Sequence, residues 1–469
     1  MAGFEFSAGV NADNVFLVNF LDLQGRLDPA FHNEMPDITN FSKLSNIAYV
    51  KGGKRIPQGK SYVSSETPYL YLRVTDFNQD GIIDYDGVNF IDNDVFEELS
   101  RYEIHIGQLA ISIAGTIGRI LLIEDIPHGK KIILTENCAK IILKNTEIDP
   151  KYFFMVMNLS IVQKQIRLNY IQTTIPNLGL DRINNLYLPK FPPLATQQQR
   201  VLFYQTQFNQ KQQKEQQAQA LLDSIDGYLL NELGITLPKQ DNRLEKRMFT
   251  VPFSEVVGIR TDPDYSLKYA LLFSQKGYYN FTKLKDLLIG TPQYGANEEG
   301  KERITDDDVR YIRITDIDEL GILKNNNWKT AQTIDKQYLL NQDDILFARS
   351  GSVGRCYIHK ETEQPAIFAG YLIRFKVNKE RLNPDFLFYY CNSMFYKLWV
   401  SAIERPAVQS NINAEEFKAL PIALPPIEKQ TEIATHITQI RAQAKQLQAE
   451  AAKLLATAKA DIERIILGS

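Results

Sequence analysis

Apolar residues near the end of the chain are separated by alternating steps of four and three positions. They are Ile433, Ile437, Ile440, Ala444, Leu447, Ala451, Leu454 and Ala458. This spacing puts them in one seam of a helix, along which a second helix can pack over its whole length. Pro425 and Pro426 precede the seam and Gly468 follows it, as start and stop signals do. The pattern predicts a long paired helix ending at Leu467; the alternative, a helix lying on a globular core, is rarely so long or so regular.

A stretch in the middle of the chain has the same character. Residues 192–197 (PPLATQ) correspond to residues 425–430 (PPIEKQ), and each is followed by a polar segment rich in glutamine. The two segments close with the pairs Leu233-Gly234 and Leu467-Gly468. We therefore expect two long helices, one mid-chain and one terminal, that pair as a spacer between two globular bodies.

The chain contains a tandem repeat whose blocks keep their order. Residues 71–76 (YLRVTD) recur as residues 311–316 (YIRITD), and residues 115–119 (GTIGR) recur as residues 351–355 (GSVGR). Further matched blocks begin at Arg26 and Arg260, Lys43 and Lys283, Gly81 and Gly321, and Asp149 and Asn383. Chance resemblance over so many ordered blocks is improbable, so we expect the two halves to share one architecture.

Each half combines strands with helices. Segments such as residues 69–74 alternate apolar positions and are rich in β-branched residues, which favours strands. The pattern becomes helical around residues 152–157 and 386–390. The predicted fold class is α+β: two tandem-repeated mixed α/β bodies, about residues 20–190 and 255–422, separated by two long antiparallel helices that form a coiled coil.

Composition places broad limits on function. The 469 residues are enough for two or three domains. Cys138, Cys356 and Cys391 are too few and too scattered for a disulfide framework or a zinc site, which fits the reducing cytoplasm. No apolar run reaches the roughly 18 residues of a membrane span, and the N-terminus does not resemble a secretory signal. The net charge of -3 argues against a histone-like coat of DNA but allows a clamp with local basic loops.

Catalytic and cofactor-binding patterns are not found in the sequence. Residues 59–61 (GKS) end like a phosphate-binding loop, but Lys54 stands where the required glycine should be. Residues 383–386 (NPDF) faintly resemble the Asn-Pro-Pro-Phe of adenine methyltransferases, yet a capped helix start with a proline explains them better. The histidines have no metal-ligand spacing and are expected to be structural or surface residues: His32, His105, His128, His359 and His436. We therefore predict no catalytic residue, no metal and no cofactor on this chain, which binds rather than reacts.

The candidate binding residues lie in the repeated glycine turns and in the loops that differ most between the halves. Glycines permit close backbone approach, hydroxyls hold phosphates, arginine forks onto phosphate or guanine, and amides read base edges. In the first half the candidates are Lys54, Arg55, Lys60, Arg73, Thr116, Arg119, Gln172, Thr173 and Thr174. In the second half they are Gln293, Tyr294, Arg303, Arg313, Arg349, Ser350, Ser352, Arg355 and Gln409.

Structural alternatives stand beside each of these candidates. The glycine turns can be tight β-turns whose arginines are solvated surface charges. Arg73 and Arg313 precede Asp76 and Asp316 by three residues, so structural ion pairs are at least as good an explanation as DNA contacts. The amide-rich stretches before the long helices can be turns and helix caps.

Taken together, these features resemble the specificity subunit of type I restriction–modification systems. The resemblance rests on the two bodies with their glycine turns, on the helix entries at residues 188–197 and 420–430, and on the two long helices, and it covers about residues 15–469. It implies target recognition domains at residues 1–190 and 237–424, with spacer helices at residues 191–236 and 425–469. One departure is the polar run at residues 209–217, which interrupts the apolar seam.

The resemblance also implies a function. Each recognition domain of the family reads one half of a bipartite duplex DNA sequence, and the helix pair sets the gap of unread bases between the halves. Each half docks one methyltransferase subunit, and restriction subunits join the complex. S-adenosylmethionine and ATP are bound by those partner subunits, so a non-catalytic, cytoplasmic DNA-recognition subunit is expected.

Three alternatives remain open. The chain can be the specificity subunit of a related system, in which it guides a fused restriction–methylation enzyme. It can instead be a protein-interaction scaffold built around a coiled coil, which the near-neutral charge would suit. A stand-alone methyltransferase is disfavoured because its cofactor motifs are missing.

Overall fold

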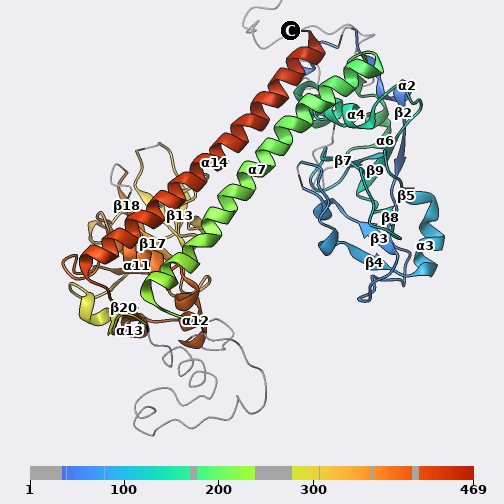
Figure 1. Cartoon of the computed structure of the whole chain (residues 1–469). Coiled ribbons are helices and arrows are strands. Elements are labelled where there is room, and N and C mark those ends of the chain that lie inside the picture. The colour runs from blue at the N-terminus through green and yellow to red at the C-terminus, as the bar shows by residue number, and fades with distance from the viewer. Residues whose placement is uncertain are drawn as a thin grey trace, which may run out of the picture. The chain divides into compact units, whose positions relative to one another are not determined.

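The structure is a computed structural model of the whole chain (Figure 1). It describes residues 34–38, 40–78, 80–169, 177–237, 277–305, 307–360, 364–403 and 411–468. The chain forms two compact units: Met1–Gln212 with Ala451–Ser469, and Gln213–Glu450. Each unit holds one copy of the repeat and part of each long helix. The sequence patterns instead predict the two helices as segments separate from the recognition domains.

The first unit is built around two four-stranded sheets. One has the strand order β2-β9-β6-β7 and is antiparallel throughout. Its strands are β2 (Ala48–Gly52), β6 (Leu109–Ser112), β7 (Ile120–Leu122) and β9 (Cys138–Leu143). The other has the order β4-β3-β8-β5, with β3 and β8 parallel. Its strands are β3 (Tyr69–Leu72), β4 (Asn89–Ile91), β5 (Glu103–Ile104) and β8 (Lys131–Leu134).

Short helices and a strand pair complete this unit. The helices are α2 (Leu44–Ile47), α3 (Asn93–Leu99), α4 (Pro150–Met157), α5 (Ser160–Asn169) and α6 (Leu180–Asn184), with 3₁₀ turns η3 (Val74–Asp76), η4 (Tyr85–Gly87) and η5 (Ser100–Tyr102). Strand β1 (Ser42–Lys43) pairs with β10 (Tyr187–Leu188), directly before the long helix α7 (Leu194–Leu233).

The second unit repeats this plan. Its first sheet has the order β12-β19-β16-β17, the counterpart of β2-β9-β6-β7. The strands are β12 (Gln293–Tyr294), β16 (Ile345–Ala348), β17 (Cys356–Ile358) and β19 (Leu372–Phe375). The second sheet has the order β13-β15-β14-β18 and again contains one parallel pair, β14 with β18. Its strands are β13 (Gly300–Glu302), β14 (Arg310–Ile312), β15 (Lys329–Ala331) and β18 (Ala366–Phe368).

The remaining elements also have counterparts in the first unit. They are η6 (Leu284–Leu287), η7 (Ile314–Asp316), η8 (Lys336–Tyr338), α11 (Pro384–Tyr390), α12 (Met394–Ile403) and α13 (Ala414–Lys418). Strand β11 (Phe281–Lys283) pairs with β20 (Pro421–Ala423) just before α14 (Ile427–Leu467), as β1 pairs with β10 before α7. The two predicted α+β bodies are thus confirmed. They share the order of the first sheet and the parallel pair of the second sheet. The second sheets differ in their fourth strand, which is β5 beside β8 in the first unit and β13 beside β15 in the second.

Sequence signals that predicted helix starts and stops are confirmed. Asp149 caps α4 and Asn383 caps α11, in each case with proline at the start of the helix. The long helices end at Gly234 and Gly468, which adopt φ angles of 67° and 72°. This left-handed conformation is one that glycine adopts without strain, so each Leu-Gly pair ends its helix.

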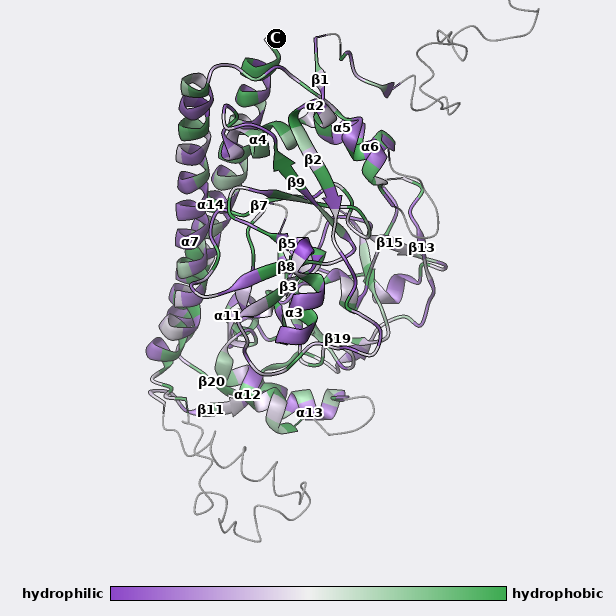
Figure 2. Cartoon of the chain, turned by 90° about the vertical axis from the view of Figure 1, so that its right-hand side faces the viewer, coloured by the Kyte–Doolittle hydropathy of each residue, from purple (hydrophilic) through white to green (hydrophobic). Residues whose placement is uncertain are grey.

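The predicted apolar seam of α14 faces inward. Five of its eight residues, Ile433, Ile437, Ala444, Ala451 and Ala458, are at most 2% exposed. The other three, Ile440, Leu447 and Leu454, are half-buried. In Figure 2 the remaining faces of α7 and α14 are largely hydrophilic, as a solvated outer surface requires. A narrow apolar seam with small residues allows two helices to pack closely. Because the seam is narrow, most residues of these helices are polar.

Within each unit, part of α7 runs antiparallel to part of α14. In the first unit, Arg200 donates to the carbonyl of Ile465, and Ile462 joins the same core as Val201. In the second unit, Lys214 pairs with Glu450, 2.6 Å apart, and Glu232 pairs with Lys429, also 2.6 Å apart. The polar run 209–217 leads into the buried Ala218, which is 1% exposed.

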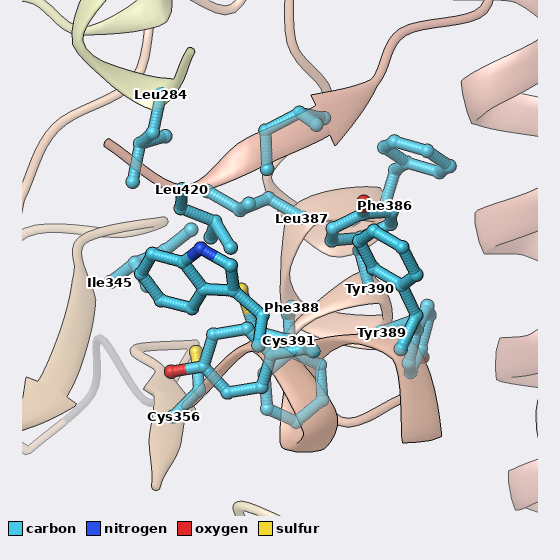
Figure 3. Packing of buried hydrophobic residues seen from close by; sticks show 14 of the residues in the cluster. Leu284, Ile345, Cys356, Phe386, Leu387, Phe388, Tyr389, Tyr390, Cys391 and Leu420 are labelled. Atoms are coloured by element: carbon cyan, nitrogen blue, oxygen red, sulfur yellow. The ribbon is translucent and has the colours of Figure 1, made fainter. Parts of the chain in front are cut away.

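Aromatic side chains fill the core of the second unit. Trp399, Tyr390, Phe386 and Phe395 are among its largest fully buried residues. Figure 3 shows residues of α11 gathered against Leu284, Ile345 and Leu420. Leu229, Leu233, Ile433 and Ile437 of the two long helices belong to the same cluster, so the helices are part of the core of the domain.

A buried glutamine joins each recognition body to the start of its long helix. Gln430 is fully buried; its Nε2 donates to the carbonyls of Arg381 and Pro425 at 3.0 and 2.8 Å, and its Oε1 accepts from the Asn383 amide at 2.8 Å. Gln197 makes the matching three bonds in the first unit, to Glu147, Pro192 and Asp149. These repeated bonds satisfy backbone groups that water does not reach.

Replacing Gln430 with leucine should destabilise the second unit. The substitution leaves one amide and two carbonyls without partners in the interior, which costs at least about 2 kcal/mol. Both tryptophans, Trp328 and Trp399, lie in this unit, so urea unfolding followed by tryptophan fluorescence reports on it directly.

Two variants control this measurement. Gln446→Leu changes an exposed glutamine of the same helix, whose amide bonds only Glu450 at 2.9 Å, and should shift the free energy of unfolding by less than about 0.5 kcal/mol. Gln197→Leu should leave the tryptophan transition in place. Equal midpoints for Q430L and Q446L would contradict the structural role of Gln430.

Candidate nucleic-acid interface

A groove of about 800 Å³ opens on the first recognition body. It lies between the loop at residues 55–62, the end of β3 with the following 3₁₀ turn, the glycine turn at residues 114–116, and residues 135–137. Four of the predicted DNA-binding residues line it: Arg55, Lys60, Arg73 and Thr116. The fold thus brings together residues that are far apart in the sequence, on a face open to solvent.

Arg55 and Glu136 face each other across this groove. Arg55 Nε donates to Glu136 Oε1 at 2.7 Å. The other oxygen, Oε2, accepts from Thr135 Oγ1 at 2.7 Å and from the Tyr71 hydroxyl at 3.3 Å. Burial raises the pKa of Tyr71 to about 12, so this hydroxyl stays a neutral donor at physiological pH.

The other two basic candidates of this loop point to solvent. Lys60 is exposed, and its Nζ lies 3.9 Å from Asp94 Oδ2, which is a loose, largely solvated pair. Lys54 is also exposed, while its backbone carbonyl accepts the Tyr71 hydroxyl at 2.8 Å. A mobile, hydrated cation suits a phosphate contact, which needs charge more than a fixed direction.

Arg73 and Arg313 form the structural ion pairs that the sequence allowed. Arg73 lies 2.7 Å from Asp76, and Arg313 lies 2.7 Å from Asp316. Each aspartate also accepts from the backbone amide of its arginine, which caps the 3₁₀ turn after the strand. These hydrogen bonds raise the pKa of both arginines. A DNA contact by either arginine stays a prediction.

The arginines of the glycine turns are tied to backbone carbonyls. Arg119 Nη1 donates to the carbonyls of Val74 and Phe77, at 3.1 and 2.6 Å. Arg355 Nη1 donates to the carbonyl of Ile317 at 2.6 Å, the matching bond in the second unit. These bonds hold the glycine turn to the 3₁₀ segment, so the structure gives both arginines a bracing role that a surface charge would not have.

Glycine is required in both turns for steric reasons. Gly118 and Gly354 have φ angles of 84° and 80°. A Cβ at Gly118 would lie 2.8 Å from Ile166, and one at Gly354 would lie 2.7 Å from Val400. The repeated Gly-x-x-Gly pattern is therefore set by a tight turn packed on a helix, as the structural alternative expected. Thr116, in the same type of turn, is exposed at the groove.

The candidates of the second unit fall into separate places. Arg349 lies 5.0 Å from the ring centre of Tyr294, and its Nε donates to Asn411 at 3.4 Å. Ser350 is buried and forms a backbone bridge with Asn411. These contacts bring the predicted Tyr294, Arg349 and Ser350 together. Tyr294 is 39% exposed and so partly open to solvent.

Other candidates in this unit have different contacts. Gln293 accepts a hydrogen bond from the buried Arg374 and is held in place. Arg303 lies 4.8 Å from the ring centre of Trp328. Ser352 and Arg355 line a hollow of about 380 Å³ together with Lys397. Four further candidates, Gln172, Thr173, Thr174 and Gln409, lie outside the described residues.

Sequence reasoning missed Glu136, Thr135 and Tyr71 as part of the site. Their signal was available in the repeat, because Thr135 and Glu136 align with Ala369 and Gly370 when Leu134 is matched to Phe368. A polar pair that one repeat has and the other lacks marks a position that the shared frame does not require.

Two searches of the described residues bear on other function classes. Among them, no cluster of three or more histidine, cysteine or acidic side chains has the geometry of a metal site. Within the same part of the chain, no helix combines the length and apolarity that crossing a membrane demands.

Comparison with known proteins identifies the family. The model of the type I restriction modification DNA specificity domain matches residues 36–223 and again residues 277–455. A specificity subunit of the type I restriction enzyme MjaVIII, from Methanocaldococcus jannaschii, is 23% identical over 420 residues, which is 84% of each chain. The specificity subunit of the type I restriction enzyme EcoBI, from Escherichia coli, is 26% identical over 166 residues, 35% of this chain and 34% of its own.

Solved structures of the same kind align with most of the chain. One comes from work on the structural basis of complex assembly and conformational transition of the type I restriction–modification system. The alignment covers 91% of this chain and 96% of that chain, at 15% identity and a TM-score of 0.49. The two family matches span most of the residues of both units. The chain therefore belongs to the family of type I restriction–modification DNA specificity proteins, as a specificity subunit whose two repeats are its target recognition domains.

Proposed function

We propose that each target recognition domain reads one half of a bipartite duplex DNA sequence, the first through the face that carries its groove. The observation that carries this proposal is the contrast between a repeated frame and unrepeated loops. Both domains keep the strand order of the first sheet, the capped helices and the Arg–Asp pairs. The loop at residues 55–62 and its counterpart after Gly295 differ in charge and in length. Two modules with one frame and different loops suit two unlike half-sites.

The two long helices act as the spacer in this proposal. Helix α7 has 40 residues and α14 has 41. At 1.5 Å per residue each is about 60 Å long. Half-sites read from one face of B-DNA lie about 34 Å apart, or a multiple of that distance. A rod of this length is sufficient to fix how many bases remain unread.

The chain contributes recognition and leaves the chemistry to partners. Each half docks one methyltransferase subunit, and restriction subunits join through that complex. S-adenosylmethionine and ATP are bound by those subunits, and this chain carries out no catalytic step. Its three cysteines are free and buried, which suits work on chromosomal DNA in the reducing cytoplasm.

Two experiments test this function. A gel shift with duplex DNA, with and without the methyltransferase partner, should show sequence preference; a coiled-coil scaffold that binds only proteins would show none. Mapping methylated adenines in the host genome with and without the gene should then give a bipartite sequence. Finding that the chain directs a single fused restriction–methylation enzyme would instead support the related system.

A four-residue insertion within residues 209–217 of α7 should change the number of unread bases. Four residues are close to one helical turn, so the same faces of the helix still point inward while the rod lengthens by about 6 Å. Methylated-adenine mapping should return both half-site sequences unchanged with a different gap.

The matched control inserts the same four residues in the surface turn at residues 127–130. Gly129 adopts a φ of 76° there, and a side chain at this position would meet nothing within 4 Å. This variant should keep the original gap. A change in the bases read by the α7 variant would argue against a spacer role.

Exchanging residues 51–180 for the matching part of another specificity subunit should change one half-site only. These residues carry the whole groove of the first domain, while the second domain keeps its own loops. The reciprocal exchange of residues 291–411 should change only the other half-site. Methylation mapping that finds both halves altered by one exchange would mean that the domains do not read independently.

A further inference from the structure

The ion pair between Arg55 and Glu136 lies largely open to solvent. The Arg55 side chain is 81% exposed, and the Glu136 side chain is 31% exposed. A pair this open to water contributes little to stability, because solvent screens it and ordering a long side chain costs entropy. What the pair provides is a direction for the guanidinium, because Arg55 Nε points to Glu136 Oε1.

Glu136 is well placed to orient the arginine. Thr135, whose hydroxyl bonds one carboxylate oxygen, is only 4% exposed, so that oxygen is fixed from the protein side. The other oxygen takes Arg55 Nε at 2.7 Å. Partial burial works to raise the pKa of Glu136, but the hydrogen bonds from Thr135 and Arg55 outweigh it and the pKa is lowered. The carboxylate is therefore charged at neutral pH.

This arrangement leaves the outer end of the guanidinium for a ligand. Only Nε takes part in the bond to Glu136, and within the described part of the chain the two Nη groups make no hydrogen bond. Two parallel N–H groups facing a groove match the O6 and N7 acceptors that guanine presents in the major groove.

The second domain has the same backbone at this place. Tyr71 donates to the carbonyl of Lys54 at 2.8 Å, and Tyr311 donates to the carbonyl of Ala296 at 2.9 Å. The preceding glycines, Gly53 and Gly295, both lie too close to the neighbouring strand for any side chain, with an added Cβ at 2.0 and 2.3 Å from a carbonyl oxygen. The residue after Lys54 thus corresponds to the residue after Ala296.

The side chains at this matched position differ in kind. Arg55 corresponds to Asn297, and Glu136 corresponds to Gly370. A Cβ on Gly370 would lie 2.1 Å from Asn297 Oδ1, so the amide occupies the space that a side chain at position 370 would need. One domain therefore presents a charged, oriented arginine, and the other presents a neutral amide on the same backbone.

We propose that Arg55, oriented by Glu136, reads a guanine in the half-site of the first domain, and that the second domain lacks this guanine reading because it has Asn297 and Gly370 there. This inference rests on the proposed function, in which each domain reads one half-site. Glu136 is a positioning residue, and Arg55 is the residue that touches the base.

The test measures binding by the specificity subunit in complex with its methyltransferase subunits. Duplexes carrying the mapped bipartite site are changed at one guanine at a time, to adenine, in the half-site of the first domain. The wild-type complex should lose about 5- to 150-fold in affinity at one of these positions, the range for one forked arginine–guanine contact.

Three variants separate the roles. Arg55→Lys keeps the charge but loses the fork, so its preference for that guanine should fall below about threefold. Glu136→Gln should relax the same position and no other. The double variant R55N/E136G, which copies the second domain, should abolish the preference. In all three, the second half-site should be read as in the wild type.

Lys151→Ala is the matched control. Lys151 and Glu124 form an exposed pair 2.6 Å apart that lies outside the groove. This variant should read every base as the wild type does. Lys60→Ala offers a contrast within the groove: a phosphate contact should weaken binding to all sequences alike and lower its salt dependence.

The outcomes distinguish the two levels of the proposal. If the wild-type complex shows no bipartite preference, the proposed function fails and this inference with it. If the wild type reads a bipartite site but R55K keeps every guanine preference, the inference alone is wrong. It is equally overturned if Arg55→Ala weakens binding to all sequences alike, because Arg55 would then contact phosphate.

Discussion

A buried side-chain amide at the start of each long helix attaches that helix to the recognition domain before it. Gln197 and Gln430 each bond three backbone groups of the recognition domain that precedes them, and both are at most 1% exposed. A domain attached through flexible chain alone would change direction freely relative to its helix. Because these bonds run from a helix side chain to the backbone of the domain, they fix the first turn of the helix to that domain.

The core of each unit also depends on both long helices. Ile462 of the terminal helix lies in the hydrophobic cluster of the first recognition domain. Leu229 and Leu233 of the central helix lie in the cluster of the second, beside Ile433 and Ile437. Neither domain has a complete core without residues from both helices. The long helices are therefore structural parts of the recognition domains, a point that their polar composition hides.

The helices and their ends could be predicted from the sequence because they depend on patterns of neighbouring residues. The seam of α14, the capped starts of α4 and α11 and the glycine stops all follow from spacing and from backbone chemistry. The site was harder to predict, because hydrogen-bond partners come from distant segments. Nothing near Arg119 in sequence indicates that it braces the carbonyl of Phe77, and nothing near Arg55 indicates Glu136.

The sequence blocks that recur in both repeats stabilise the shared fold and do not form the predicted DNA-reading surface. The Gly-x-x-Gly-Arg turn appears in both domains because both need the same tight turn and the same brace, Arg119 in one and Arg355 in the other. Two domains that read unlike half-sites cannot share their base-reading side chains. It follows that, in a tandem repeat of this kind, the reading residues are to be sought where the aligned backbone is the same and the side chain is not. Arg55 against Asn297, and Glu136 against Gly370, are such positions.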